Sequence, residues 1–281
     1  MLYPIISEHI NNKRQTKAIT AYNIELSDTS IDKIENILND AKLFNQKILK
    51  LNNRFTDFEE LSEDYYQTLR IGISDIVAYI EIPAIDVYLP IYHGTEKSVL
   101  QIGVGHMEGT SLPIGGNGTH CVLSGHTGLP SAKLFNDLAK MKVGDVFTIH
   151  ILKQSLLYKV EQINVVLPYE MELLAIQPNK DLVTLLTCTP YGSNTHRLLV
   201  QGKRIEDTNN EIKISNIDDY RIENDELVNF PIHVQIILIN IILVIIAKII
   251  LELRIYRLRI KRKRKKRKRR LVFNSTLSTN Q

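Results

Sequence analysis

Residues 184–191 read TLLTCTPY, and this short stretch says more about the fold and chemistry of the chain than any other. An apolar, β-branched run leads to Cys188 at the end of a predicted strand, and Thr189–Gly192 open a loop. Arg197 follows nine residues after the cysteine, at the start of another apolar run. Upstream, VLSGHTG at 122–128 brings His126 to the end of a strand in the same way. A thiol, an imidazole and a guanidinium are the groups that cysteine-dependent acyl transfer uses, so the sequence predicts that chemistry.

Each of these three side chains also has a plainer interpretation. A lone cysteine in an apolar strand is usually a core residue, but Cys188 ends its strand, where a substrate can reach the thiol. His126 is one of eight histidines and is either the catalytic base or a hydrogen-bonded loop residue. Gly125 and Gly128 beside it permit close approach of another segment, which favours the base. Arg197 is either a solvated charge or a donor that holds the oxyanion of a tetrahedral intermediate.

The two cysteines, Cys121 and Cys188, are 67 residues apart. Outside the cell a disulfide is the ordinary expectation for such a pair. Cys121, however, lies five residues before His126 in a predicted strand, so its side chain points to the opposite face. We therefore predict a buried structural thiol at Cys121 and a free nucleophile at Cys188. Neither the paired cysteine spacing of a zinc site nor a phosphate-binding or dinucleotide glycine motif occurs, so we expect no metal and no cofactor.

The net charge of +4 hides a segregated distribution. Residues 254–270 contain 13 Lys and Arg and no acid; without them, 22 basic residues stand against 31 acidic ones, a balance of −9. Because the basic residues are confined to one block, we expect that the folded part does not bind nucleic acid.

That basic block directly follows an apolar run. Residues 232–247 contain no Lys, Arg, Asp or Glu, and the run continues with two interruptions to Leu253. Twenty-two residues rise about 33 Å as a helix, enough for a hydrocarbon core of about 30 Å. A buried helix of a soluble protein is the alternative, but the basic flank favours a transmembrane helix at 231–253. The positive-inside rule then predicts a polybasic cytoplasmic tail at 254–281, touching anionic lipid, with the preceding residues outside the cell.

The start of the chain has no recognisable export signal. Met1–Ser7 has no basic region, and its apolar run is too short for a secretory signal. Since the predicted topology requires export of about 230 residues, we expect an export segment ahead of the given N-terminus.

The sequence before the predicted membrane helix has two parts that differ in their pattern of apolar residues. Residues 7–52 carry apolar residues at helical spacing, and residues 53–75 have the composition of a polar connector. From Ile76 onward, seven short β-type runs are separated by turn residues, with only brief helical stretches such as Ala132–Met141. This pattern predicts a closed antiparallel barrel. The predicted organisation is an N-terminal helical region with a possible lid (1–75), a catalytic barrel (76–206), a linker (207–230), the membrane helix and the tail.

These residues resemble the sortases, and within them the class C, pilin-polymerising sortases of Gram-positive bacteria. TLLTC at 184–188 resembles the sortase signature TLxTC, and TPYGSNTHRLLVQGKR at 189–204 resembles its class C continuation. The likeness covers roughly residues 76–205, with a looser match at YPIIS (3–7), and includes these further motifs in one order: YIEIP at 79–83, LPIYHG at 89–94, GHMEGTSLP at 105–113 and SGHTGLP at 124–130.

The resemblance implies the eight-stranded sortase barrel, a second membrane segment, and Cys188, His126 and Arg197 as catalytic residues. Thr187 and Thr189, which flank the cysteine, are predicted to contact substrate. The chain departs from the family where class C sortases carry an Asp-Pro-aromatic lid motif before the barrel: the nearest counterpart is Asp57-Phe58, without the proline. Thr127 follows the histidine where many relatives have arginine.

The sequence thus predicts a membrane-anchored cysteine transpeptidase that acts outside the cell. Cys188 would cleave an LPxTG-like sorting signal between Thr and Gly through a thioester, and a lysine amine of the next pilin subunit would resolve it. Two other functions remain open: a sortase that attaches proteins to the peptidoglycan precursor, and a non-catalytic scaffold that binds pilins through the same groove.

Overall fold

The structure is a computed structural model that describes residues 3–129 and 132–205, together with separate helical positions between 236 and 254. The chain divides into two compact units, residues 1–220 and residues 221–281. The predicted site lies in the first unit. The predicted linker, and all of the tail after residue 254, lie outside the described residues.

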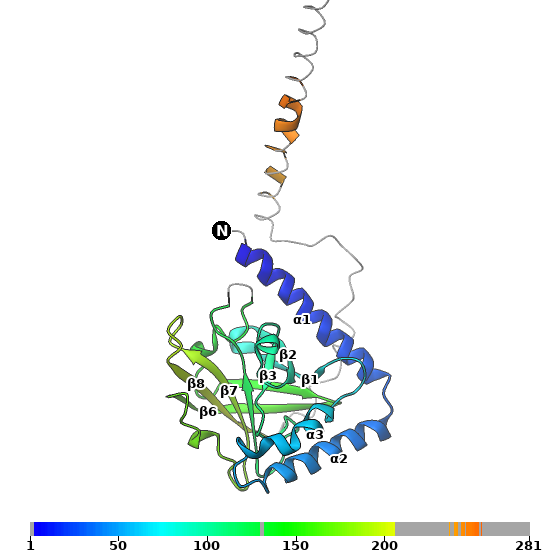
Figure 1. The fold of residues 1–281 in the computed structure, drawn as a ribbon, viewed down its shortest axis with the longest axis vertical. Coiled ribbons are helices and arrows are strands. Elements are labelled where there is room, and N and C mark those ends of the chain that lie inside the picture. The colour runs from blue at the N-terminus through cyan, green and yellow to red at the C-terminus, as the bar shows by residue number, and fades with distance from the viewer. Residues whose placement is uncertain are drawn as a thin grey trace, which may run out of the picture. The chain divides into compact units, whose positions relative to one another are not determined.

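Eight strands close into a barrel in the order β1-β2-β3-β4-β7-β8-β6-β5 (Figure 1). This confirms the mainly β fold and the eight-stranded barrel that the resemblance implies. The strands are β1 (Ile76–Ile82), β2 (Val87–His93), β3 (Val104–His106), β4 (Thr119–Ser124), β5 (Val146–Ile151), β6 (Gln154–Val166), β7 (Asp181–Thr189) and β8 (His196–Arg204).

The barrel is mixed, so the prediction of a purely antiparallel sheet is wrong. β2 pairs with β3 and β4 pairs with β7 in parallel, while the other neighbouring pairs are antiparallel. Each of the seven predicted β runs forms a strand, but β3 was missed because three residues are too short to show an alternating pattern. The β4–β7 pairing matters most here, because it joins the two strands that carry His126 and Cys188 toward their ends.

Strand residues alternate between the barrel interior and the outer face, as the period of a β-strand requires. Interior positions of β4, β7 and β8 belong to the main core; they include Cys121, Leu123, Val183, Leu185 and Val200. Positions of the opposite parity form a second apolar cluster on the outer face, centred on Val122, Leu174 and Leu199. The barrel therefore has two apolar surfaces, and only one of them is its core.

Helices before β1 cover the side and one end of the barrel (Figure 1). They are α1 (Tyr3–Ser27), α2 (Ile31–Ile48), the 3₁₀ turn η1 (Asp57–Leu61) and α3 (Ser62–Gln67). The buried Tyr22 hydroxyl ties α1 to the barrel, because it donates to the Val77 carbonyl at 3.3 Å and accepts from the Leu152 N–H at 2.8 Å. The region 53–75, predicted as a plain connector, thus contains two short helical turns.

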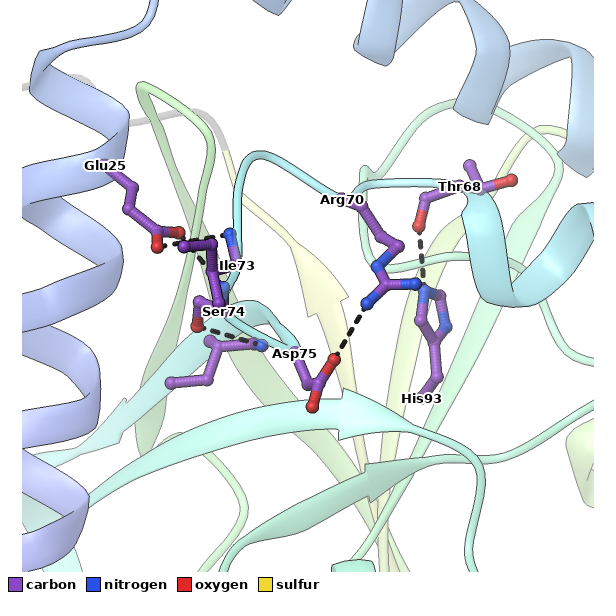
Figure 2. Close-up of polar contacts among 8 residues, drawn as sticks. Glu25, Thr68, Arg70, Ile73, Ser74, Asp75 and His93 are labelled. Carbon is purple, nitrogen blue, oxygen red and sulfur yellow. Dashed lines mark hydrogen bonds and ion pairs between the residues drawn. The ribbon is translucent and has the colours of Figure 1, made fainter.

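The segment that leads from α3 into β1 is tied on both sides (Figure 2). On one side the Glu25 carboxylate of α1 accepts the backbone N–H groups of Ile73 and Ser74, each at 3.3 Å. On the other side Nε2 of His93, at the end of β2, lies 2.8 Å from the Thr68 carbonyl. These contacts fix residues 68–74, which connect α3 to β1, between α1 and the barrel.

Two histidines outside the predicted catalytic set end neighbouring strands. His93 ends β2, and His106 ends β3 opposite it. Nε2 of His106 donates to the Ser111 carbonyl at 2.8 Å, so Nδ1 accepts the Tyr65 hydroxyl at 2.8 Å. Burial lowers the pKa of His106 to about 3, which keeps it neutral. It is a structural histidine that joins α3 to the barrel.

The remaining helices are short: α4 (Lys97–Leu100), η2 (Pro83–Ile85), η3 (Leu138–Lys140) and η4 (Glu172–Leu174). The helical stretch predicted at Ala132–Met141 is wrong except for the single turn η3. Leu134 has a positive φ of 38°, which a helix does not accommodate, and the Phe135 N–H donates to the His126 carbonyl at 3.1 Å. This segment folds back on the end of β4 instead of forming a helix.

Among the described positions, no helix has both the length and the apolar character needed to cross a bilayer. About half of the residues in the helix predicted at 231–253 lie outside the described part of the chain.

Candidate active site

The β4–β7–β8 register brings the three predicted catalytic positions to one end of the barrel. Cys188 and Arg197 are directly paired across the antiparallel β7–β8 ladder. The last parallel pair of β4 and β7 is Ser124 with Leu186, two residues before His126 and Cys188 respectively. Because the Gly125 N–H still donates to the Leu186 carbonyl, at 3.0 Å, the pairing continues past that point. His126 therefore lies level with Cys188, one strand away.

All three side chains belong to the outer face. Cys188 has the parity of Leu186 on β7, and Arg197 that of Leu199 on β8, both of which belong to the outer apolar cluster. His126 has the parity of Val122, which belongs to the same cluster. All three residues are neither fully buried nor fully exposed. Cys188 is thus a residue of the barrel rim rather than of the core.

Cys121 behaves as the sequence predicts and does not form a disulfide. Both cysteines are free, and Cys121 is buried in the main core while Cys188 is partly exposed. Burial raises the pKa of the Cys121 thiol, and the negative charge of Asp181 raises it further, so this thiol stays protonated.

The backbone around His126 is held by hydrogen bonds from two directions. The Thr187 hydroxyl donates to the Gly125 carbonyl at 2.7 Å, and the Phe135 N–H donates to the His126 carbonyl at 3.1 Å. Gly125 has no room for a side chain, because a Cβ there would lie 2.5 Å from the Phe135 ring. A glycine before the histidine is therefore needed for this close approach rather than for loop flexibility.

The imidazole of His126 is biased toward its neutral form. Partial burial lowers its pKa below the usual 6.5, and the positive charge of Lys97 on α4 lowers it further. A neutral imidazole can accept the thiol proton of Cys188 and return it later as imidazolium, which is the behaviour of a general base and acid near neutral pH.

Replacing Lys97 by glutamine is expected to raise the pKa of His126. Lys97 is exposed and its charge is screened, so we expect the upward shift to be small. The imidazolium then persists to higher pH, and any rate that depends on protonated His126 falls at correspondingly higher pH. An NMR titration of the His126 ring measures the shift, and Lys142→Gln, a lysine in a turn remote from β4, serves as control. An unchanged or lowered pKa would contradict this assignment.

The Arg197 guanidinium is held by its own loop. Its Nη1 donates to the carbonyls of Asn194 and His196, at 3.1 and 3.0 Å. Asn194 has a left-handed φ of 53°, and its N–H donates to the Pro190 carbonyl at 3.0 Å, which closes the turn between β7 and β8. With one nitrogen fixed in this way, the remaining guanidinium donors are preorganised for another acceptor.

The outer apolar cluster is covered by residues 171–175, which we call the cover segment. Three consecutive carbonyls of this segment accept side-chain hydrogen bonds from three parts of the chain. Gln201 of β8 donates to Leu173 at 3.3 Å, Arg54 donates to Leu174, and His120 of β4 donates through Nδ1 to Ala175, at 2.9 Å. Burial lowers the pKa of His120 to about 4, so this histidine is a neutral structural donor and not a second acid or base.

Arg54 reaches the cover segment from the helical region. Residues 53–55, which we call the strap, also pack against Gly109, where a Cβ would lie 2.3 Å from the Arg54 carbonyl. The strap therefore spans from the loop after β3 to the cover segment. Nη1 of Arg54 is buried without a hydrogen-bond partner, and burial lowers the pKa of this guanidinium.

Four other predicted site residues have these positions. Phe58 is buried against Phe44 and Tyr65 in the helical layer, and the Asp57 carboxylate accepts the Asn53 N–H at 3.0 Å, at the base of the strap. The Thr187 side chain points into the barrel and is only 4% exposed, whereas Thr189 lies at the rim opposite His196.

Sequence reasoning missed Arg54, His120 and Gln201. Their role depends on contacts between segments far apart in the chain, and no local motif marks them. Among the described residues, no group of three or more His, Cys, Asp or Glu side chains is arranged to hold a metal ion.

A closed mixed barrel that presents a thiol, an imidazole and a guanidinium on three neighbouring strands defines a protein of the cysteine-nucleophile class. Residues 80–205 match the sortase domain family. The structure is similar to that of sortase C1 from Streptococcus agalactiae, with a TM-score of 0.64 and 46% identity over 68% of this chain and 98% of that one. The chain belongs to the sortase family.

Two further relatives agree with this assignment. The structure of Streptococcus pneumoniae sortase C, described in connection with pilin substrate specificity, matches with a TM-score of 0.60 and 42% identity, over 68% of this chain and 97% of that one. Sortase D of Bacillus subtilis is 30% identical over 129 residues, which are 45% of this chain and 62% of that protein. The chain spans between 52% and 62% of the length of the curated relatives that it matches.

Proposed function

We propose that the protein is a cysteine transpeptidase that cleaves an LPxTG-like sorting signal between Thr and Gly and joins the threonine to a lysine amine of a pilin subunit. The observation that carries this proposal is the direct pairing of Cys188 with Arg197, with His126 level with them on the next strand. These groups can act on one carbonyl, since all three lie on the same face at the same end of the barrel.

In the first half-reaction the Cys188 thiol gives its proton to His126, and the thiolate attacks the threonine carbonyl. The guanidinium of Arg197 donates to the resulting oxyanion. When the C–N bond breaks, the imidazolium of His126 protonates the departing glycine amine, and a thioester remains. In the second half-reaction a lysine amine attacks the thioester and loses a proton to His126. The thiolate leaves and is reprotonated, which restores the resting enzyme.

The partly exposed edge of the outer apolar cluster gives the sorting signal a place to bind. Leu186 precedes Cys188 by two residues on the same face and is only partly buried, whereas Val122 and Leu199 are buried beneath the cover segment. A leucine and a proline that precede the scissile bond by a few residues can bury apolar surface there. The choice of a pilin as donor and acceptor rests on the class C likeness and on the pilin specificity described for the pneumococcal relative.

We further propose that this catalytic barrel acts on the outer side of the cell membrane, anchored by the apolar run at 231–253. The basic residues after it would remain in the cytoplasm and contact anionic lipid. This part of the proposal depends on the sequence pattern alone.

The function is tested with the full-length chain in detergent, a sorting-signal peptide and two acceptors offered together, a pilin lysine peptide and a peptidoglycan-type amine. The expected products are an acyl adduct on Cys188 and a peptide joined to the pilin lysine, both identified by mass spectrometry. A product joined mainly to the peptidoglycan amine would support the cell-wall alternative. Binding of the peptide without any adduct would support the non-catalytic scaffold and overturn the proposal.

We also propose that the strap acts as the lid of the groove, in place of the predicted Asp57-Phe58. It crosses the outer face between Gly109 and the cover segment, whereas Phe58 is packed inside the helical layer. The contact between the Arg54 guanidinium and the Leu174 carbonyl holds the strap only weakly. Its acceptor is a neutral carbonyl, and Nη1 of Arg54 is buried without a hydrogen-bond partner.

Replacing Arg54 by alanine is expected to release the strap and to raise kcat/KM for the sorting peptide by about three- to tenfold, which corresponds to the loss of one hydrogen bond of ordinary strength. Alkylation of Cys188 by iodoacetamide should change little, because a small reagent does not need the groove. The matched control is Arg70→Ala, which removes an exposed arginine paired with Asp75 at 3.0 Å. If kcat/KM for the sorting peptide is the same in Arg54→Ala and the native protein, the proposal that the strap acts as a lid is refuted.

A further inference from the structure

We propose that Thr187 is a positioning residue, whose buried hydroxyl keeps His126 level with Cys188. The inference rests on the proposed function, because it assigns a role within that reaction. Two properties of Thr187 support it: which face its side chain occupies, and what its hydroxyl contacts.

Thr187 lies on the opposite face of β7 from Cys188. Its neighbour across the β7–β8 ladder is Leu198, a core residue, and its own side chain is 4% exposed. The hydroxyl is already engaged with the Gly125 carbonyl at 2.7 Å. A side chain in this position does not meet a peptide on the outer face. This argues against the substrate-contacting role predicted from the sequence.

The hydrogen bond of the Thr187 hydroxyl continues the contact between β4 and β7 beyond the last regular pair of their ladder. Regular β4–β7 pairing stops at Ser124 and Leu186, and beyond it the main chain contributes the Gly125 N–H to the Leu186 carbonyl at 3.0 Å. The Gly125 carbonyl would then lack a partner on β7, and the Thr187 hydroxyl supplies one. Gly125, the residue directly before His126, is thus held at both its N–H and its C=O by the two residues before Cys188.

This arrangement links β7, which carries the nucleophile Cys188, to the end of β4, which is followed by the acid and base His126. A displacement of the His126 ring by about 1 Å is enough to reduce a proton transfer by up to about a hundredfold. Loss of the Thr187 hydroxyl leaves the Gly125 carbonyl buried without a partner, and the end of β4 is then free to shift. On the other side, the Phe135 N–H on the His126 carbonyl and the Asn136 side chain on the Gly128 N–H would still hold this end of the strand.

Thr119 provides a matched control within the same strand pair. Its hydroxyl also donates to a glycine carbonyl, that of Gly116 at 2.6 Å, and its side chain is also buried at 8% exposure. It lies at the opposite end of β4, paired with Asp181. Thr119→Val therefore removes the same kind of bond from the same barrel without touching the site.

The test compares Thr187→Val with Thr187→Ser and Thr119→Val in the full-length chain. We expect kcat of Thr187→Val to fall about tenfold to a hundredfold with KM within about twofold. Thr187→Ser should recover kcat to within about threefold, and Thr119→Val should keep the native kcat. If Thr187→Val does not fold, Thr187→Ala against Thr187→Ser makes the same comparison, since these two variants differ by the hydroxyl alone.

An NMR titration of the His126 ring gives a second readout that does not need turnover. Its pKa should move up toward the ordinary value in Thr187→Val, as the loosened ring becomes more solvated, and stay unchanged in Thr119→Val. If the native protein joins no peptide, the proposed function fails, while this titration still decides the positioning role. Native kcat and native His126 titration in Thr187→Val, or equal losses in Thr119→Val, would overturn the inference.

Discussion

The Cys188→Ala variant is expected to form no acyl adduct and to lose transpeptidation by at least about 10⁴-fold, because no other group on the outer face can replace the nucleophile. Cys188 is partly exposed at the rim, so removal of its sulfur leaves little cavity, and the fold should persist. Adduct formation is measured by intact mass, and turnover by the appearance of the joined peptide.

The matched control for this prediction is Cys121→Ala. That thiol lies in the barrel core, so its removal should lower the thermal midpoint while the adduct on Cys188 still forms. The two variants should therefore behave in opposite ways. Transpeptidation that survives in Cys188→Ala, or an adduct found on Cys121, would show that the nucleophile has been assigned to the wrong residue.

Replacement of Arg197 by alanine is expected to reduce kcat and kcat/KM equally, by about 10²- to 10³-fold, the usual effect of removing an oxyanion donor. Arg197→Lys should recover only part of the loss. A lysine keeps the charge but lacks the planar fork that lets one nitrogen hold the Asn194 and His196 carbonyls while the other nitrogens keep their donors for the oxyanion.

The kinetic pattern decides the role of Arg197. A residue that binds the peptide equally in the ground and transition states would raise KM and leave kcat alone, and this result would argue against oxyanion stabilisation. Arg204, at the other end of β8, is the control: its guanidinium lies 5.6 Å from the Tyr158 ring centroid, so Arg204→Ala should affect stability and not kcat.

Local pattern was enough to predict seven of the eight strands. The run 182–188 is largely apolar and β-branched, and Arg197 starts the next apolar run nine residues after Cys188, so the sequence places both residues at strand ends, while the structure adds their direct pairing. The prediction for Ala132–Met141 failed for a physical reason. Apolar spacing there resembles a helix, but the Phe135 N–H bonds to the His126 carbonyl, a partner on another segment.

Asp57-Phe58 resembles the lid motif of the family, yet Phe58 packs against Phe44 and Tyr65 in the helical layer, which the local sequence does not indicate. The segment that crosses the outer face is the strap, which is recognised by its contacts with Gly109 and Leu174. The local sequence NRF at 53–55 does not indicate these contacts.

The sequence by itself determined the strand-forming runs, the thiol at the end of one of them, the segregated charge and the family likeness, because these depend on residue type and short spacing. Only the tertiary structure decided that β4 and β7 pair in parallel, which places His126 beside Cys188 and turns the Thr187 hydroxyl toward Gly125. Parallel strands need a long crossover, and many registers are compatible with the same apolar pattern. Packing of the whole barrel selects one of them, and with it the geometry of the site.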